Sequence, residues 1–346
     1  MQGHIDKLSK HIGFEIEKKP IGAIQWDFVC SIPEARESLL KNYEIGPESL
    51  FLYLTNQCSM KCKECINSGK IEELDLDDIK NMLETEKNKK LRYVILDGDP
   101  LLSKNIYNVI DIINDLGLSY SINTFKCPSE QLLEKIQDTV AKVQFKMQDL
   151  ENEEYNKYII KSLEMCNKYN IYTAIIFTIN NTNYKDIKRM IEFCKKYNVK
   201  QFSFSRLSFC PNYRKKYEFI DRKKYLEISK KLVEYREKEK DIHITSNDAI
   251  WKGCGACGLT ATIYPKGDIY PCAYLKEKCG NVKNGMEESW RSKVFENIRK
   301  SELEGKCKKC KYNLLCKGCR ALAYLETDNY QAEDTGCWIE GENLNE

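Results

Sequence analysis

The sequence predicts an α/β fold built on a parallel sheet, followed by a small, loop-rich module with many cysteines. Two observations predict the sheet: six short apolar runs are typical of strands, and amphipathic stretches with helical spacing lie between them. Alternating strand and helix units imply parallel strands with right-handed crossovers. The third observation is a change of composition, because residues 241–346 hold nine of the 17 cysteines and few long apolar runs.

These observations divide the chain into three parts. Residues 1–48 form a mixed segment with no readable chemistry, residues 49–240 form the core, and residues 241–346 form the cysteine-rich module. A long charged helix over about 221–240 is expected to close the core. The six strands are expected at 51–56, 91–96, 118–122, 142–146, 171–177 and 200–205.

Composition and charge exclude several classes of function. The chain holds 55 Lys and Arg against 52 Asp and Glu, so its net charge of +3 gives no argument for binding to nucleic acid or to an anionic membrane. The N-terminus lacks an apolar signal core, and the apolar runs fall far short of the roughly 18–20 residues of a membrane span. We therefore expect a cytoplasmic protein. In that compartment, 17 cysteines are more typical of metal binding than of disulfides.

Three cysteines follow the first expected strand directly. Cys58, Cys62 and Cys65 are spaced C-x3-C-x2-C. Three thiolates on one loop can hold three irons of a cubane cluster and leave the fourth iron open to a small molecule. In barrel-like α/β folds the reactive groups lie on loops after the carboxyl ends of strands, which is where this loop falls. A structural zinc loop is the alternative, and it would need a fourth protein ligand nearby.

This loop resembles the signature of radical S-adenosylmethionine (SAM) enzymes. The resemblance implies a partial (β/α)6 barrel, open at one side, in which the open iron binds SAM. One electron then cleaves SAM to a 5′-deoxyadenosyl radical that abstracts a hydrogen from the substrate. The second strand ends in Asp97-Gly98-Asp99-Pro100, where the family often has Gly-Gly-Glu-Pro, so Gly98 and Asp99 are expected to hold the SAM amino group.

The resemblance also implies SAM contacts after the later strands. Each of these residues can equally be part of the barrel rim, and the motif around Lys146 departs from the family's strand-four motif. The expected contacts are Asn123, Lys146, Ser205 and Leu207.

A second set of cysteines occupies the C-terminal module. Cys257 and Cys272 are spaced C-x9-G-x4-C, and Lys-Gly-Asp at 266–268 predicts a hairpin turn that brings them to one end. The array continues with Cys307, Cys310, Cys316, Cys319 and Cys337. This pattern resembles the SPASM extension of radical SAM proteins, with x2 in place of x3 before Cys319. Two zinc-ribbon sites are the alternative, since C-x2-C pairs also bind zinc.

The SPASM resemblance implies two auxiliary 4Fe–4S clusters, and so three 4Fe–4S clusters in the whole chain. The inner auxiliary cluster would be held by Cys254, Cys257, Cys272 and Cys319. The outer auxiliary cluster would be held by Cys307, Cys310, Cys316 and Cys337. Cys279 is either a bystander or a spare ligand. Because the module has little apolar core of its own, metal binding is expected to supply part of its folding free energy.

Most SPASM proteins modify peptides or proteins, which favours a peptide maturase acting on a ribosomal precursor. It would form a crosslink or oxidise a side chain, with the auxiliary clusters assisting electron transfer. The expected partners include an electron donor such as flavodoxin or ferredoxin. Because only 57 residues precede Cys58, we expect either a separate leader-binding protein or direct binding of the leader by the core. An enzyme that modifies a haem or quinone precursor is the alternative, and a non-catalytic electron carrier is a third reading. Ala273 counts against the sulfatase-maturing relatives, which place an Asp base there, and no catalytic acid or base can be named.

Overall fold

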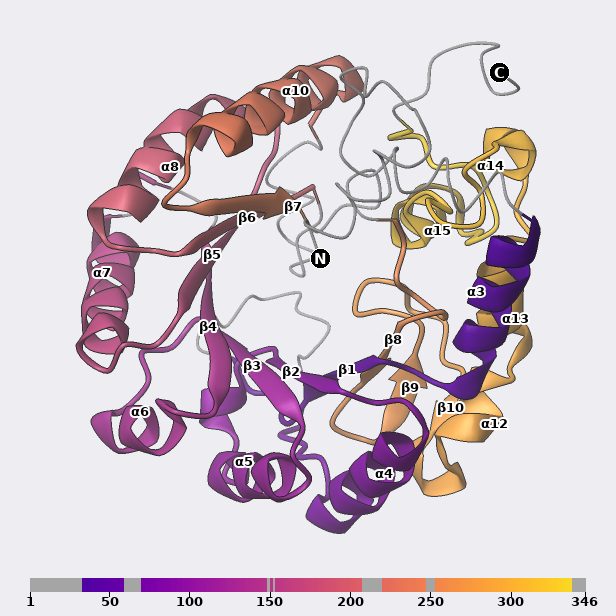
Figure 1. Cartoon of the computed structure of the whole chain (residues 1–346), viewed down its shortest axis with the longest axis horizontal. Coiled ribbons are helices and arrows are strands. Elements are labelled where there is room, and N and C mark those ends of the chain that lie inside the picture. The colour runs from indigo at the N-terminus through magenta and orange to yellow at the C-terminus, as the bar shows by residue number, and fades with distance from the viewer. Residues whose placement is uncertain are drawn as a thin grey trace.

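The structure is a computed structural model that describes residues 33–58, 70–147, 150–151, 153–206, 220–246 and 253–337. At its centre lies a sheet in which the strands β1 to β7 run parallel and follow the order of the chain (Figure 1). These strands are β1 (Ser49–Tyr53), β2 (Tyr93–Asp97), β3 (Ser119–Thr124), β4 (Val140–Met147), β5 (Thr173–Thr178), β6 (Gln201–Ser205) and β7 (His243–Ser246). The predicted α/β class with a parallel sheet is confirmed.

Helices cover the outer face of this curved sheet, and Figure 1 shows them as a ring around the strands. The ring contains α4 (Leu76–Lys89), α5 (Ile106–Asp115), α6 (Glu130–Ile136), α7 (Glu153–Lys168), α8 (Ile187–Lys196) and α10 (Arg222–Lys238). Short 3-10 turns precede α5 and α8, at η1 (Pro100–Leu102) and η2 (Tyr184–Asp186). In α8 the residues Ile187, Met190 and Ile191 are buried, because their spacing places them on one face of the helix.

The sequence anticipates most of these elements. Each of the six predicted strands overlaps one of β1 to β6, and the predicted charged helix corresponds to α10. The sequence analysis missed β7, because His243-Ile-Thr-Ser has only one strongly apolar residue. In the structure β7 pairs with β6 and extends the sheet by one strand.

The C-terminal module continues this sheet at its other edge. β8 (Thr260–Ile263) pairs parallel with β1, and β9 (Asp268–Tyr270) and β10 (Gly280–Asn281) follow as antiparallel strands. β8 and β9 form the predicted hairpin. The remaining elements are η3 (Val282–Asn284), α12 (Met286–Trp290), α13 (Lys293–Lys300), α14 (Gly305–Lys309) and α15 (Arg320–Thr327). The boundary predicted after residue 240 stays a prediction, and β7, which lies beyond it, belongs to the same sheet as the core strands.

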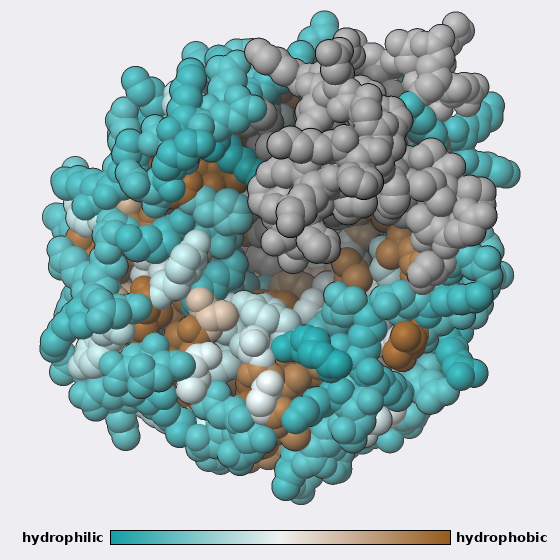
Figure 2. Space-filling model, in the orientation of Figure 1, coloured by the Kyte–Doolittle hydropathy of each residue, from teal (hydrophilic) through white to brown (hydrophobic). Residues whose placement is uncertain are grey.

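One hydrophobic core runs through both parts of the chain, from Leu50 in β1 to Leu322 in α15. Figure 2 shows hydrophilic residues over most of the outer rim of the face in view, with the hydrophobic residues mainly inward of that rim. Among the described residues, no helix combines the length and the apolar character that crossing a membrane requires.

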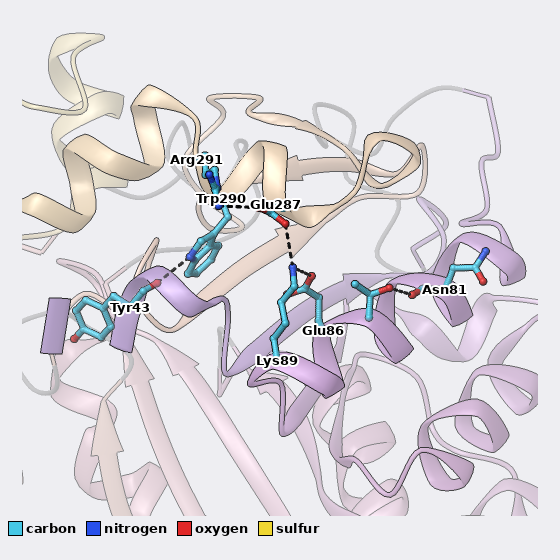
Figure 3. Close-up of polar contacts among 8 residues, drawn as sticks. Tyr43, Asn81, Glu86, Lys89, Glu287, Trp290 and Arg291 are labelled. Carbon is cyan, nitrogen blue, oxygen red and sulfur yellow. Dashed lines mark hydrogen bonds and ion pairs between the residues drawn. The ribbon is translucent and has the colours of Figure 1, made fainter. Parts of the chain in front are cut away.

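The helix α3 (Pro33–Ile45) joins the barrel to the module, a role that the sequence did not reveal for this segment. The Trp290 indole N–H donates to the Tyr43 carbonyl at 2.8 Å (Figure 3). Lys89 adds a second link, because its ammonium pairs with Glu86 at 3.1 Å and with Glu287 of the module at 3.8 Å. Contacts from α3, which precedes β1, and from α4 thus hold the module against the barrel.

Candidate metal and cofactor site

The first site begins at the carboxyl end of β1, where Cys58 is half-buried. Cys62 and Cys65 lie outside the described residues. The Asn56 side chain ties together the two ends of the loop that carries the three cysteines. It donates to the Lys70 carbonyl at 2.8 Å and accepts from the Glu72 amide at 2.9 Å. The loop is therefore closed on itself beside the edge of the sheet.

The turn after β2 presents a buried carboxylate to the same edge. Asp99 is fully buried and accepts a hydrogen bond from the Thr124 hydroxyl at 2.8 Å. Gly98 has φ +86°, and a Cβ at this position would lie 2.9 Å from the ring of Tyr53. Both the backbone conformation and the close contact require glycine here. The two predicted residues of this turn therefore lie together, with Gly98 against Tyr53 at the carboxyl end of β1.

Lys146 lies inside the barrel, but its charge is already balanced. Its ammonium donates to Asp97 Oδ1 at 2.6 Å, and both side chains are buried. Its backbone carbonyl accepts from the Tyr155 hydroxyl at 2.6 Å. The sequence analysis did not select Asp97, yet the signal was present: Asp97 and Lys146 are both departures from the motifs of the family that the chain resembles. In the structure, Asp97 at the end of β2 and Lys146 in β4 form an ion pair across β3.

Two other predicted contacts also lie at the carboxyl edge of the sheet. Asn123 in β3 is buried, and its Oδ1 has no hydrogen-bond partner among the described residues. Ser205, the last residue of β6, is buried as well. Leu207 lies outside the described residues. An unpaired buried carbonyl such as that of Asn123 is costly unless a ligand donates to it.

The next residue, Arg206, connects this edge to the end of the module. Its guanidinium lies 4.5 Å from the ring centroid of Tyr225 and donates to the Gly336 carbonyl at 3.2 Å. One guanidinium nitrogen is 3.9 Å from a carboxylate oxygen of Asp334. Asp334 in turn accepts from the Cys319 amide at 2.7 Å. The SAM-binding edge predicted for the barrel is thereby linked to one of the predicted cluster ligands.

The thiol of Cys254 lies close enough to three other cysteines to affect their pKa values, and these four are the cysteines predicted to hold the inner cluster. Burial, together with the thiol of Cys254, raises the pKa of Cys272 to about 11. Burial likewise raises the pKa values of Cys257 and Cys319 well above their usual range, with Cys254 again close enough to contribute. The Cys254 amide donates to the carbonyls of Leu315 and Cys316 at 3.1 and 3.2 Å, which holds it beside the second set.

The four cysteines predicted to hold the outer cluster form a separate neighbourhood. Burial raises the pKa of Cys316, and the thiols of Cys337 and Cys310 contribute to the increase. Burial also raises the pKa of Cys310, with a contribution from Cys307. Cys279 lies nearer the inner set, because its thiol contributes to the raised pKa of Cys257.

These thiols suit metal ligation by a cluster. Burial favours their neutral form, and a bound metal would deprotonate them outright, so loading would release protons. In the described part of the chain, no three His, Cys, Asp or Glu side chains converge as ligands of a single metal ion.

A stacked pair of tyrosines spans the distance between the two regions. Tyr53 at the end of β1 stacks on Tyr264, which follows β8, with ring centroids 4.6 Å apart. Tyr53 contacts Gly98, and the Tyr264 hydroxyl donates to the Ala273 carbonyl, next to Cys272, at 2.8 Å. Lys276 donates to the Tyr264 hydroxyl at 2.5 Å. The sequence analysis missed this cluster because Tyr53 and Tyr264 resemble ordinary strand residues.

Two family models match two different parts of the chain. Residues 52–194 match the sequence model of the family described as "Radical SAM superfamily". Residues 254–320 match the SPASM model, described as an "Iron-sulfur cluster-binding domain".

Curated relatives match over different extents. An AdoMet-dependent heme synthase of Nitratidesulfovibrio vulgaris is 37% identical over 117 residues, which is 31% of this chain and 31% of that protein. The chain thus matches about a third of that relative's length. An AdoMet-dependent heme synthase of Methanosarcina barkeri is 23% identical over 340 residues, covering 84% of this chain and 96% of that protein.

Among solved structures, SuiB of Streptococcus suis bound to its precursor peptide SuiA is similar in fold. The TM-score is 0.71 at 17% identity, and the match covers 98% of this chain and 88% of SuiB. At this identity the likeness concerns the fold alone.

Proposed function

We propose that this protein, which belongs to the radical SAM superfamily and carries a SPASM iron–sulfur domain, is a peptide maturase. As a radical SAM/SPASM enzyme it uses SAM and 4Fe–4S clusters. Our proposal adds the substrate class: a peptide or protein, in particular a ribosomal precursor, that acquires a crosslink or an oxidised side chain. The observation that carries the chemistry is the position of Cys58 after the carboxyl end of β1, together with the buried carboxylate of Asp99 after β2, the strand that pairs with β1.

We infer three clusters with the ligand sets predicted from the sequence. Cys58, Cys62 and Cys65 would hold the SAM cluster, and the two C-terminal sets would hold the inner and outer auxiliary clusters. When bound, the SAM cluster supplies the electron that cleaves SAM to a 5′-deoxyadenosyl radical, which abstracts the substrate hydrogen. The grouping of the eight module thiols into two electrostatic neighbourhoods supports this assignment.

The residues of the barrel edge would bind and orient SAM. Asp99 would accept hydrogen bonds from the SAM ammonium, and Gly98 would allow the backbone to approach it. The unpaired carbonyl of Asn123 would accept from a hydroxyl or amino group of the nucleoside. Lys146 would act through Asp97, because the Asp97 carboxylate also accepts from the Gly98 amide at 2.7 Å and so fixes the turn. Ser205 and Leu207 remain proposed contacts from their position after β6.

The buried cations at this edge favour a peptide over a haem precursor. A haem precursor carries several carboxylates and would be recognised by cations that have no protein counter-charge. Lys146 pairs with Asp97 at 2.6 Å, and Arg206 lies 3.9 Å from Asp334. Both of these described cations are therefore neutralised within the protein. The fold shared with SuiB, whose structure contains a precursor peptide, also supports a peptide substrate.

A haem-precursor enzyme is the second candidate. Its support is the similarity to the Methanosarcina barkeri heme synthase along almost the whole of that protein. The two candidates differ in substrate and share the same SAM chemistry. We also infer a flavodoxin or ferredoxin as the electron donor.

The first experiment tests the SAM chemistry. Anaerobically reconstituted protein with excess dithionite should hold about 12 irons per chain and convert SAM to 5′-deoxyadenosine. Replacing Cys58, Cys62 and Cys65 with Ala should abolish that product and leave about 8 irons. Cys127→Ala, outside every proposed ligand set, is the matched control and should keep both. Material that holds only zinc, or that leaves SAM intact, would contradict the proposal.

The second experiment separates the substrate classes. The reconstituted enzyme is incubated with SAM, reductant and either short peptides encoded beside its gene or haem precursors, and the products are analysed by mass spectrometry. A peptide that loses two hydrogens is the expected result. Turnover of a haem precursor with no change in any peptide would favour the second candidate.

A further inference from the structure

The turn between Cys316 and Cys319 contains a buried lysine that the proposed mechanism does not use. Lys317 is only 1% exposed and has φ +55°, and the next residue, Gly318, has φ +61°. Two successive residues in the left-handed region thus separate Cys316 from Cys319. A lysine rarely adopts this conformation, so this position combines backbone strain with a buried charge.

The Lys317 ammonium has no hydrogen-bond partner among the described residues. The ring centroid of Tyr43 lies 5.0 Å from its nitrogen and screens it from solvent. A cation–π contact stabilises a buried ammonium by less than the burial of that charge costs. Tyr43 alone therefore does not compensate for the burial of this charge.

Other buried lysines in the structure do have counter-charges. Lys146 lies 2.6 Å from Asp97, and Lys90 lies 3.0 Å from Glu48. The groups around Lys317 are instead three thiols and one further cation. Burial lowers the pKa of Lys317, the thiols of Cys254, Cys257 and Cys316 oppose this effect in that order, and the nearby guanidinium of Arg299 adds to it. Two of the three belong to the proposed inner set, so the unpartnered ammonium faces a metal-binding position.

We propose that the inner auxiliary cluster is the counter-charge of Lys317, and that the Lys317 ammonium raises the reduction potential of that cluster. This inference rests on the proposed ligand sets. Reduction adds negative charge to a cluster, so a fixed cation nearby stabilises the reduced state, and the low-dielectric surroundings strengthen the effect. Lys317 is therefore a positioning and electrostatic residue that makes the inner cluster a better electron acceptor.

The test measures reduction potentials and requires neither SAM nor substrate. The full-length chain with Cys58, Cys62 and Cys65 replaced by Ala is reconstituted anaerobically, and its two auxiliary clusters are titrated with reductant and followed by electron paramagnetic resonance. A further Cys272→Ala change identifies which signal belongs to the inner cluster. Lys317→Met should make reduction of the inner cluster at least tenfold less favourable, a negative shift of about 59 mV for one electron.

Two variants control for the removal of a side chain and of a charge. Lys317→Arg keeps the charge and should leave the potential close to that of the unchanged chain. Lys300→Met removes an exposed charge at the end of α13 and should shift neither signal. If Lys317→Met fails to retain iron, Lys317→Gln replaces it, with the same expected shift.

The proposal is overturned if neutral variants leave both potentials unchanged, or if the signal that persists in Cys272→Ala shifts more than the inner one. This outcome is distinguishable from failure of the proposed function. The enzyme could modify a peptide with an unshifted inner cluster, and the shift could occur in a protein that acts on another substrate.

Discussion

The barrel and the C-terminal module differ in whether a protein carboxylate balances their buried cations. In the barrel, Lys146 is neutralised by Asp97 at 2.6 Å, inside the fold. In the module, Lys317 has no hydrogen-bond partner among the described residues and lies among cysteine thiols. The barrel thus satisfies its buried cation with protein groups, whereas the module leaves a charge and a set of ligands to be satisfied by metal. Because of this difference, we expect the two regions to respond very differently to loss of iron.

The largest effect is therefore expected from removing iron. Chelation under reducing conditions should unfold the module, because metal binding is expected to supply part of its folding free energy in addition to the shared hydrophobic core. Amide hydrogen exchange should show loss of protection by about a thousandfold or more, roughly 4 kcal/mol, across α13 to α15. Strands β2 to β5 should keep their protection. Equal loss of protection in both regions would show that the barrel depends on metal as strongly as the module does.

A smaller effect is expected from breaking the ion pair of the barrel. Lys146→Met leaves the Asp97 carboxylate buried without its cation, and removing one partner of a buried pair costs about 3–5 kcal/mol. Urea unfolding of the barrel should report this loss. The double variant Asp97→Asn, Lys146→Met should recover much of it, because no uncompensated charge remains. Lys231→Met, which removes an exposed partner of Glu227, should change stability little.

If the losses of unfolding free energy in Asp97→Asn and Lys146→Met simply added up in the double variant, the two side chains would not be energetically coupled. Asp97 would then not be the group that balances the charge of Lys146. That outcome would weaken the contrast with the module. It would also return Lys146 to the status of an independent SAM contact.

The boundary between the regions offers a third test, with a more modest expected effect. Trp290→Phe removes the indole N–H that donates to the Tyr43 carbonyl at 2.8 Å, while it keeps an aromatic ring in the core. Loss of this bond should lower the unfolding free energy of the loaded protein by about 1–3 kcal/mol, since the buried carbonyl loses its donor. The iron content should be unchanged. A loss of iron would instead indicate that α3 positions the module for metal binding.

The helices and strands of the barrel could be predicted from the sequence, whereas the ion pair buried inside it could not. Periodic apolar residues such as Ile187, Met190 and Ile191 report local burial, so helices and strands could be assigned from local patterns. Cysteine spacing predicted the two sets of thiols because the ligands of each cluster come from short segments. The Asp97–Lys146 pair could not be predicted, because it crosses β3 and depends on where two distant strands end.

Two further residues show the same limit. Tyr43 contacts Trp290, which is 247 residues away, and a segment without motif or periodicity gives no sign of this role. Lys317 follows the basic run that includes Lys308, Lys309 and Lys311, all of which are exposed, so it resembled another surface lysine. Its burial follows from the turn between two cysteines, which is a property of the folded module.

The smallest expected effect concerns the opposite, amino-terminal edge of the barrel sheet, far from the proposed chemistry. His243 begins β7 in a surface cavity that Lys200, Arg236, Glu239 and Asp241 also line. Burial lowers the pKa of His243 below its usual 6.5, and the nearby charges of Arg236 and Lys142 lower it further. The folded state therefore binds fewer protons than the unfolded state as the pH falls through this range, and stability is present above pH 6.5 and declines below it.

His243→Gln should flatten this decline in urea unfolding measured on either side of pH 6.5. Lys142→Met should flatten it partly, because it removes one of the two cations. If the decline persists unchanged in His243→Gln, it originates elsewhere, and the module, whose proposed ligands must lose protons to bind metal, becomes the region to examine.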